Sequence, residues 1–171
     1  REKLLNARNE RIRPGLDDKS LTSWNALMIT ALVDAYQAFG DEKLLTGAVT
    51  TANWIVRHQQ KKDGGLYHSF KEGKSTIDGF LEDYCFTIEA FLKLYEITFD
   101  ETWVNRADGL MQFAMTHFYD EKSGMFFFTS DQSTDLIARK MELSDNVIPS
   151  SNSSMAKALF RLGTLLANDD Y

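Results

Sequence analysis

Two adjacent carboxylates, Glu82 and Asp83, are the residues of this sequence best suited to acid–base chemistry. They stand at the start of an apolar helix, where a buried carboxylate needs a partner or a solvent-filled cavity. At about 100° per residue the two side chains cannot point the same way. We assign Asp83 to a cavity. Glu82 is then expected nearer the wall of that cavity, paired with a loop N–H group or with Arg139 or Lys19.

Further polar and aromatic residues are expected beside this pair, because they precede or begin the other apolar helices. His68 and Asp145 complete the candidate acid–base set with Glu82 and Asp83. The candidate ligand-binding residues are Asp17, Asp18, Trp24, Asn25, Tyr84, Arg139, Ser150 and Asn152.

Structural roles compete with each of these functional interpretations. Asp17, Asp18, Ser150 and Asn152 are equally explained as helix caps and first-turn partners of the helix dipole. Trp24 and Tyr84 fit the apolar stripes of their helices, so core packing is favoured over ligand stacking for both. The sequence has no Cys pair, no HExxH motif and no GxSxG motif, and its three histidines show no ligand spacing. We therefore expect neither a metal nor a cofactor.

The composition excludes several partner classes. The chain has 171 residues with 19 Lys and Arg against 25 Asp and Glu, a formal net charge of −6, and no basic run. Nucleic-acid binding is therefore not expected. No apolar stretch approaches the roughly 20 residues of a membrane span, and the first residues lack the apolar core of a signal peptide. The single cysteine, Cys85, is expected to be buried and inert, and fits a reducing, cytoplasmic location.

The elements that position these residues are predicted to be helices of two alternating kinds. Residues 22–39, 79–98 and the stretch from 151 are apolar on most faces, which is typical of inner helices. Residues 42–60 and 101–117 carry one apolar stripe each and are predicted to be outer helices, with Asp41 and Asp100 as N-caps. A short helix is expected before Pro14.

A repeat of 59 residues relates these helices, as the pairs Asp41 and Asp100, Tyr36 and Tyr95 illustrate. Each unit is an inner helix, a tight turn, an outer helix and an extended segment, which indicates stacked helical hairpins. We predict one domain over residues 1–171, a fragment of a larger closed array. Because a partial array leaves apolar faces uncovered, self-association through them is expected.

The hairpin topology places the long connections, residues 61–78 and 119–149, at the end where the inner helices begin. Helix N-termini offer free N–H donors and favour anions. The candidate residues therefore converge on one rim, which is a plausible place for a small-molecule site.

Four motifs resemble the helical part of the spermatogenesis-associated, thioredoxin-domain-containing proteins. They are residues 14–19 (PGLDDK) followed by Ser23-Trp24-Asn25, residues 63–68 (DGGLYH), residues 79–84 (GFLEDY) and residues 145–153 (DNVIPSSNS). The resemblance implies an all-α fold, a partial (α/α)6 toroid similar to six-hairpin glycosidases and N-acylglucosamine 2-epimerases, with short β-hairpins in the long loops of one rim. It also implies a thioredoxin-like domain elsewhere in the full-length chain.

Two functional hypotheses follow. The first is a carbohydrate-related toroid that binds or processes a sugar-like ligand at the rim, where Asp, Glu, Asn, Trp and Tyr suit hydroxyl groups and ring stacking. The fragment contains no complete catalytic motif. Epimerases of this architecture favour paired histidines, and His68 is the one well-placed histidine of this sequence, so the residues do not support an epimerase. The second is a non-catalytic interaction or scaffold module that accompanies the thioredoxin-like domain.

Overall fold

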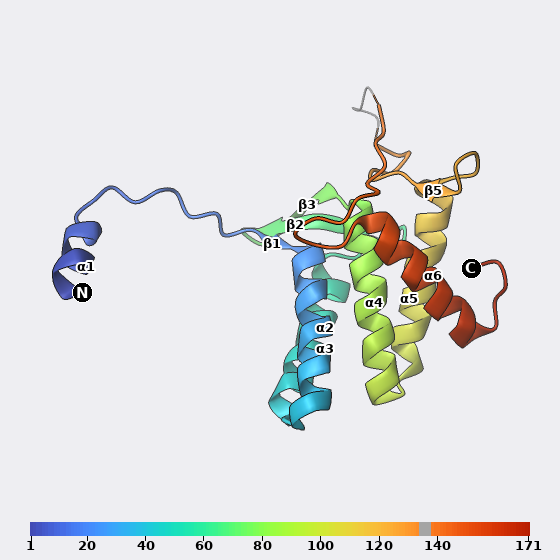
Figure 1. Cartoon of the computed structure of the whole chain (residues 1–171), viewed down its shortest axis with the longest axis horizontal. Coiled ribbons are helices and arrows are strands. Elements are labelled where there is room, and N and C mark those ends of the chain that lie inside the picture. The colour runs from blue at the N-terminus through green and yellow to red at the C-terminus, as the bar shows by residue number, and fades with distance from the viewer. Residues whose placement is uncertain (134–137) are drawn as a thin grey trace.

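The computed structural model describes residues 1–133 and 138–171, and helices dominate it (Figure 1). The helices are α1 (Glu2–Asn9), α2 (Thr22–Phe39), α3 (Glu42–His58), α4 (Leu81–Thr98), α5 (Glu101–His117) and α6 (Ser151–Leu166). The strands are β1 (Ser20–Leu21), β2 (Tyr67–Lys71), β3 (Lys74–Asp78), β4 (Tyr119–Asp120) and β5 (Met125–Phe126).

The body is a set of helical hairpins with inner and outer helices, as predicted. The inner helices α2, α4 and α6 are neighbours, and the outer helices α3 and α5 pack against α2 and α4 (Figure 1). Helix α4 is the centre of the core, because helices contact it on several sides. Its buried residues include Phe86, Phe91 and Leu94, and the Phe91 ring lies 5.2 Å from that of Trp103 on α5.

Helix α2 is less buried than its apolar composition predicts. Its buried residues are Thr22, Ser23, Ala26, Ile29 and Val33. Met28 and Phe39 are exposed, because no helix among the described residues covers that side of α2. Exposed apolar side chains also occur on α6, so association through such faces stays a prediction.

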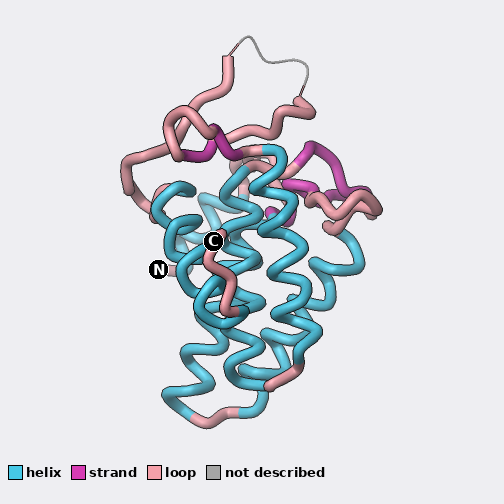
Figure 2. The backbone as a smooth tube through the Cα atoms, turned by 90° about the vertical axis from the view of Figure 1, so that its right-hand side faces the viewer, coloured by secondary structure: helices cyan, strands magenta, loops and turns pink. Residues whose placement is uncertain are grey.

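The strands and the long loops gather at one end of the helices, and the short turns lie at the other (Figure 2). Strands β1, β2 and β3 form an antiparallel sheet in that order, with Leu21 opposite Ser69 and Ser69 opposite Thr76. Strands β4 and β5 form a separate hairpin. The expected β-hairpins on one rim are therefore present, and the sheet lies next to the first turn of α2.

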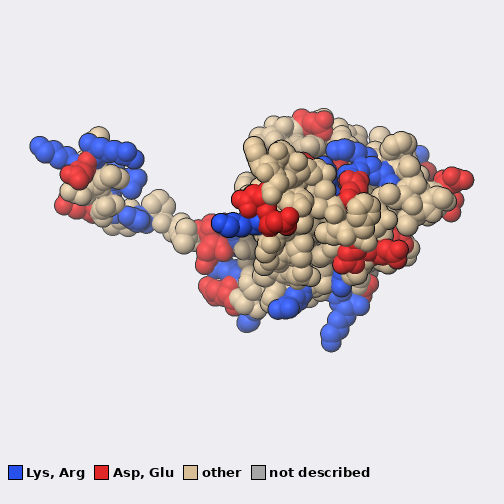
Figure 3. All heavy atoms as spheres, turned by 90° about the horizontal axis from the view of Figure 1, so that it is seen from below, with Lys and Arg blue, Asp and Glu red and all other residues tan. Residues whose placement is uncertain are grey.

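Helix α1 lies apart from this body, at the end of an extended segment (Figure 1). None of its residues is buried. Basic side chains gather on it, whereas acidic and basic groups are interspersed over the visible face of the body (Figure 3). Within the described residues, no helix has the length and hydropathy that crossing a membrane requires.

The turns at the opposite end provide a prediction about stability. Helix α2 ends at Gly40 with a φ of 69°, and α4 ends at Phe99 with a φ of 54°. The left-handed conformation costs a residue with a side chain about 1–2 kcal/mol, and the Phe99 side chain is 78% exposed. We expect Phe99→Gly to raise the free energy of unfolding by about 0.5–1 kcal/mol, after the extra freedom of unfolded glycine is allowed for.

Urea unfolding of Phe99→Gly measures this difference. The matched variant is Gly40→Ala, which places a side chain in the same conformation one hairpin earlier and is expected to lower stability by a similar amount. A loss of stability in Phe99→Gly would mean that packing by the exposed ring outweighs the backbone strain.

Candidate functional site

Asp83 is the centre of a buried hydrogen-bond network at the rim. Its side chain is 0% exposed. Its Oδ1 accepts from the backbone N–H of Ser23 at 2.9 Å, and its Oδ2 accepts from the backbone N–H of Phe80 at 2.9 Å. The same Oδ2 lies 2.9 Å from Nδ1 of His68. Both carboxylate oxygens are thus occupied by N–H donors of three different segments.

The expectation that Asp83 faces a cavity is therefore wrong. Asp83 is the third residue of α4, where a side chain turns back to the N–H of the N-cap residue Phe80. That local capping preference directs the carboxylate into the wall between α2 and α4.

Glu82 is the more exposed carboxylate of the two. Its Oε1 accepts from the hydroxyl of Ser23 at 3.2 Å, and neither Arg139 nor Lys19 pairs with it among the described contacts. Burial raises the pKa of Glu82, and the neighbouring Asp83 adds to the shift. Because a raised pKa keeps more of the group protonated, Glu82 is better suited to hold a proton than an ordinary surface glutamate.

His68 joins this network to the adjacent cavity. It lies on β2, its ring packs 4.7 Å from that of Phe80, and its side chain is mostly buried. The hydrogen bond to Asp83 raises the pKa of His68, against the opposing effect of burial. Burial also raises the pKa of Asp83, although His68 opposes that shift. Both shifts favour a proton shared between the imidazole and the carboxylate, and the contact at Nδ1 orients the histidine ring.

A cavity of about 550 Å³ lies beside His68, between the first turn of α2 and the sheet. Trp24 lines it and is 65% exposed, so the expectation that Trp24 packs in the core is wrong. The reason is that Trp24 lies on the side of α2 that no described helix covers. The residues that line the cavity are Asp17, Lys19, Ser20, Leu21, Trp24, Asn25, His68, Ser69 and Ile77.

Tyr84 and Asp18 have structural contacts instead of places in this cavity. Tyr84 is buried, stacks on Phe113 with ring centroids 5.4 Å apart, and its hydroxyl accepts from the N–H of Leu66 at 2.9 Å. Core packing of Tyr84 is therefore confirmed. The Asp18 carboxylate pairs with Lys71 of β2 at 2.8 Å. Cys85 is fully buried, as expected.

The residues predicted from the third unit build the long loop and the start of α6. Arg139 donates to the carbonyls of Thr129 and His117 at 2.6–2.9 Å. Asp145 accepts from the N–H of Ser150 at 2.8 Å, and Ser150 in turn caps α6. The Asn152 side chain bonds both the N–H and the carbonyl of Phe126.

None of these four residues is among those that line the described cavity. The hydrogen bonds of Asp145, Ser150 and Asn152 hold the loop and the β4–β5 hairpin against α6, and those of Arg139 hold the loop against the end of α5. A ligand-binding role for them stays a prediction.

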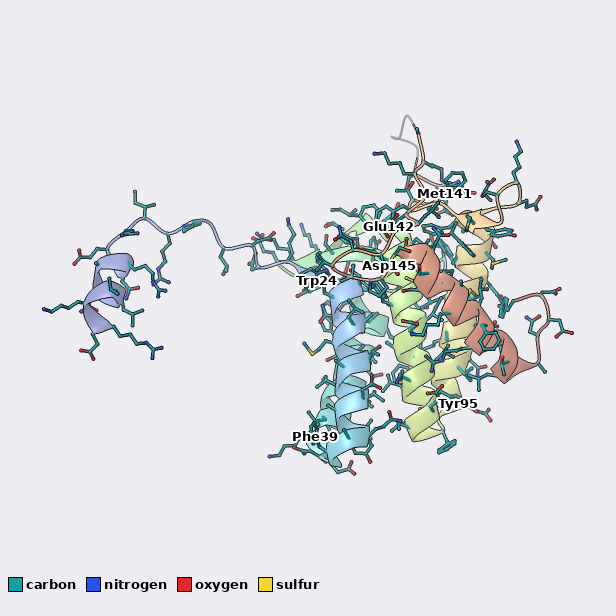
Figure 4. All side chains as sticks on the ribbon, viewed as in Figure 1. Trp24, Phe39, Tyr95, Met141, Glu142 and Asp145 are labelled. Atoms are coloured by element: carbon teal, nitrogen blue, oxygen red, sulfur yellow. The ribbon has the colours of Figure 1, made fainter. Side chains whose placement is uncertain are left out.

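Two residues at the rim were not among the candidate site residues, although Ser23 belongs to the first of the four motifs. Ser23 contacts both carboxylates, and its position one 59-residue repeat before Glu82 was the available signal. Glu142 accepts from the N–H of Ser151 at 3.0 Å and adds to the raised pKa of Glu82. Figure 4 shows Trp24, Glu142 and Asp145 close to the starts of α2 and α6. No motif distinguishes Glu142, because it lies in an irregular loop.

Oxygen and nitrogen ligands for a metal ion are also grouped here. One ligand atom each from His68, Glu82 and Asp83 lies within 4.8 Å of the others. However, both oxygens of Asp83 already accept from N–H donors, so an ion bound to this carboxylate would compete with those hydrogen bonds. The geometry therefore fits a hydrogen-bonded acid–base group better than a metal centre.

Residues 5–162 match the family model of the beta-L-arabinofuranosidase, GH127 catalytic domain. The chain belongs to this family. Spermatogenesis-associated protein 20 of Rattus norvegicus is 34% identical over 99% of the chain, and the human protein is 31% identical over the same share. The resemblance found in the four motifs is thereby confirmed. The chain spans about a quarter of the length of these relatives, 23% in both.

Solved structures of low identity share the fold. Cellobiose 2-epimerase from Bacillus thermoamylovorans superposes with a TM-score of 0.72 at 16% identity, over 89% of this chain and 41% of that one. A D-mannose isomerase superposes with a TM-score of 0.71 at 18% identity, over 90% and 38% of the two chains. These likenesses establish the partial (α/α)6 toroid.

Proposed function

We propose that this chain supplies the ligand-binding rim of a carbohydrate-active toroid and that the cavity beside His68 holds a sugar. The observation that carries the proposal is the His68–Asp83 pair, whose imidazole lines a cavity that also presents the exposed ring of Trp24. An indole face suits the C–H face of a sugar ring, and hydroxyl groups suit the polar lining of this cavity. The family and the fold neighbours, several of which bear the names of sugar-converting enzymes, support the same class of ligand.

In this proposal His68 is the residue that transfers a proton to or from the bound sugar. Its Nδ1 is held by Asp83, which leaves Nε2 without a hydrogen bond among residues 1–133 and 138–171. Asp83 fixes the ring and stabilises its charged form, and Glu82, whose pKa is raised by burial, is a second acid–base group next to the pair. The reaction class is acid–base conversion of a sugar.

Sugar binding provides the first test. We expect Trp24→Ala to weaken binding of a sugar about fivefold to thirtyfold, because the loss of one stacked ring removes about 1–2 kcal/mol. Isothermal titration of the wild type and the variant with cellobiose, D-mannose and methyl β-L-arabinofuranoside measures this.

The matched control is Trp54→Ala. Trp54 lies on α3 against His58 and Phe70 and does not line the cavity, so its loss should change stability and leave sugar affinity unaltered. If the wild type binds none of the three sugars at millimolar concentration, or if Trp24→Ala binds as the wild type does, the proposed site is wrong.

The scaffold hypothesis, with a thioredoxin-like domain as the partner, stays a prediction. Under that hypothesis the rim would bind a protein surface, and Trp24→Ala and Trp54→Ala would not differ in their affinity for sugars. Localisation in the cytoplasm also stays a prediction.

A further inference from the structure

One serine connects the two carboxylates of the rim. Ser23 is fully buried at the start of α2, and its backbone N–H donates to Asp83 while its hydroxyl donates to Glu82. The two carboxylates are consecutive on α4, so a single residue of the neighbouring inner helix holds both. The side chain and the backbone of Ser23 act on different partners, which makes their effects separable.

We propose that Ser23 is the positioning residue of the acid–base site, and that its hydroxyl fixes the carboxylate of Glu82 beside the His68–Asp83 pair. The inference rests on the proposed function for its catalytic meaning, but the contact itself can be tested without a sugar. A hydroxyl has one proton to donate, and here that proton goes to Oε1 of Glu82.

The preceding residue extends the same arrangement to β2. The Thr22 hydroxyl donates to the carbonyl of Tyr67 at 2.6 Å and accepts from the Gln59 side chain at 2.8 Å. Tyr67 is the neighbour of His68 along the strand. The first turn of α2 thus fixes β2 through Thr22 and α4 through Ser23, and these are the two elements that carry the acid–base groups.

The Ser23 hydroxyl is one of the groups that lower the pKa of Glu82. The groups that act on its pKa are Asp83 and Glu142, which raise it, and His68, which lowers it. Burial is the largest effect and also favours the protonated form, whereas the hydrogen bond from Ser23 favours the ionised form. Removal of the hydroxyl would therefore raise the pKa of Glu82 further.

The test is Ser23→Ala in the 171-residue chain, with carboxyl and imidazole titrations followed by NMR. We expect the proton-binding constant of Glu82 to rise about threefold to tenfold, which is the net effect of one hydrogen bond. The titration of His68 should change much less, because the Ser23 N–H group that holds Asp83 is retained. Ser23→Thr restores the hydroxyl and should return Glu82 toward its wild-type titration.

Ser151→Ala is the matched control. Ser151 is equally buried at the start of the inner helix α6, but its hydroxyl has no hydrogen-bond partner among the described residues. The proposal is overturned if Ser23→Ala and Ser151→Ala lower the melting temperature alike and leave the titration of Glu82 unchanged. A shifted titration in a chain that binds no sugar would support the Ser23 contact and reject the proposed function.

Discussion

Replacement of Asp83 by asparagine is expected to lower the free energy of unfolding by about 3 kcal/mol, although the side chain keeps its shape. Asparagine retains one acceptor oxygen in place of two and brings an NH₂ group toward the Phe80 N–H or the Ser23 N–H. A buried donor that loses its acceptor costs about 1–3 kcal/mol, and the loss of a buried ionic partner costs more. For a chain of this length the melting temperature should fall by about 6–12 °C.

The same variant should change how stability depends on pH. In the wild type the pKa of His68 is raised by Asp83, so this histidine stabilises the fold fully below its unfolded pKa. That stabilisation is lost as the pH rises through the higher folded pKa. In Asp83→Asn the pKa of His68 should fall, and this part of the pH dependence should disappear. Urea unfolding from pH 5 to pH 8 measures both effects.

Asp100→Asn is the control for this substitution. Asp100 is an exposed N-cap of α5 that accepts from the N–H of Thr102 at 2.9 Å. Because asparagine caps a helix about as well as aspartate, Asp100→Asn should be nearly neutral. Equal unfolding curves for the two variants would mean that Asp83 is an ordinary cap and that its buried network contributes nothing further.

The hairpin array was predictable because its signals are local and repeated. The structure confirms that α2 ends in a left-handed turn at Gly40. It also confirms the N-caps of α3 and α5, which are Asp41 and Asp100. The inner and outer helices differ in how many of their faces are apolar, and this periodic difference can be read from the sequence, although α2 is less buried than its composition predicts. The same repeat also placed the N-termini of the inner helices on one rim, where the structure has them (Figure 1).

The orientations of single side chains were not predictable in the same way. Whether Asp83 or Glu82 enters the wall is decided by the capping position on α4 and by a backbone N–H from α2, a residue 60 positions away. Trp24 fits an apolar stripe, but its exposure depends on which neighbouring helices are present. Such contacts between distant segments leave no periodic signal in the sequence.

The largest effect on activity is expected from His68→Gln. Removal of a positioned proton-transfer group lowers turnover by about 10²–10⁴-fold. The variant should therefore lose most of the conversion of cellobiose, D-mannose or a 4-nitrophenyl β-L-arabinofuranoside, whichever the wild type converts. Binding of the same sugar should decrease far less, because Trp24 and the polar lining of the cavity remain. Comparison of kcat with the dissociation constant of the sugar separates the two effects.

His117 offers a matched control, since it forms the same kind of pair elsewhere on the rim. Its Nδ1 lies 2.8 Å from Oδ1 of Asp131, but His117 does not line the cavity beside Trp24. His117→Gln should retain the turnover of the wild type. If His68→Gln and His117→Gln retain activity equally, proton transfer must be assigned to another group. If both lose it in proportion to a lower melting temperature, the two histidines act through stability alone. An imidazole that is paired with a buried carboxylate and also lines a cavity should affect kcat much more than the melting temperature.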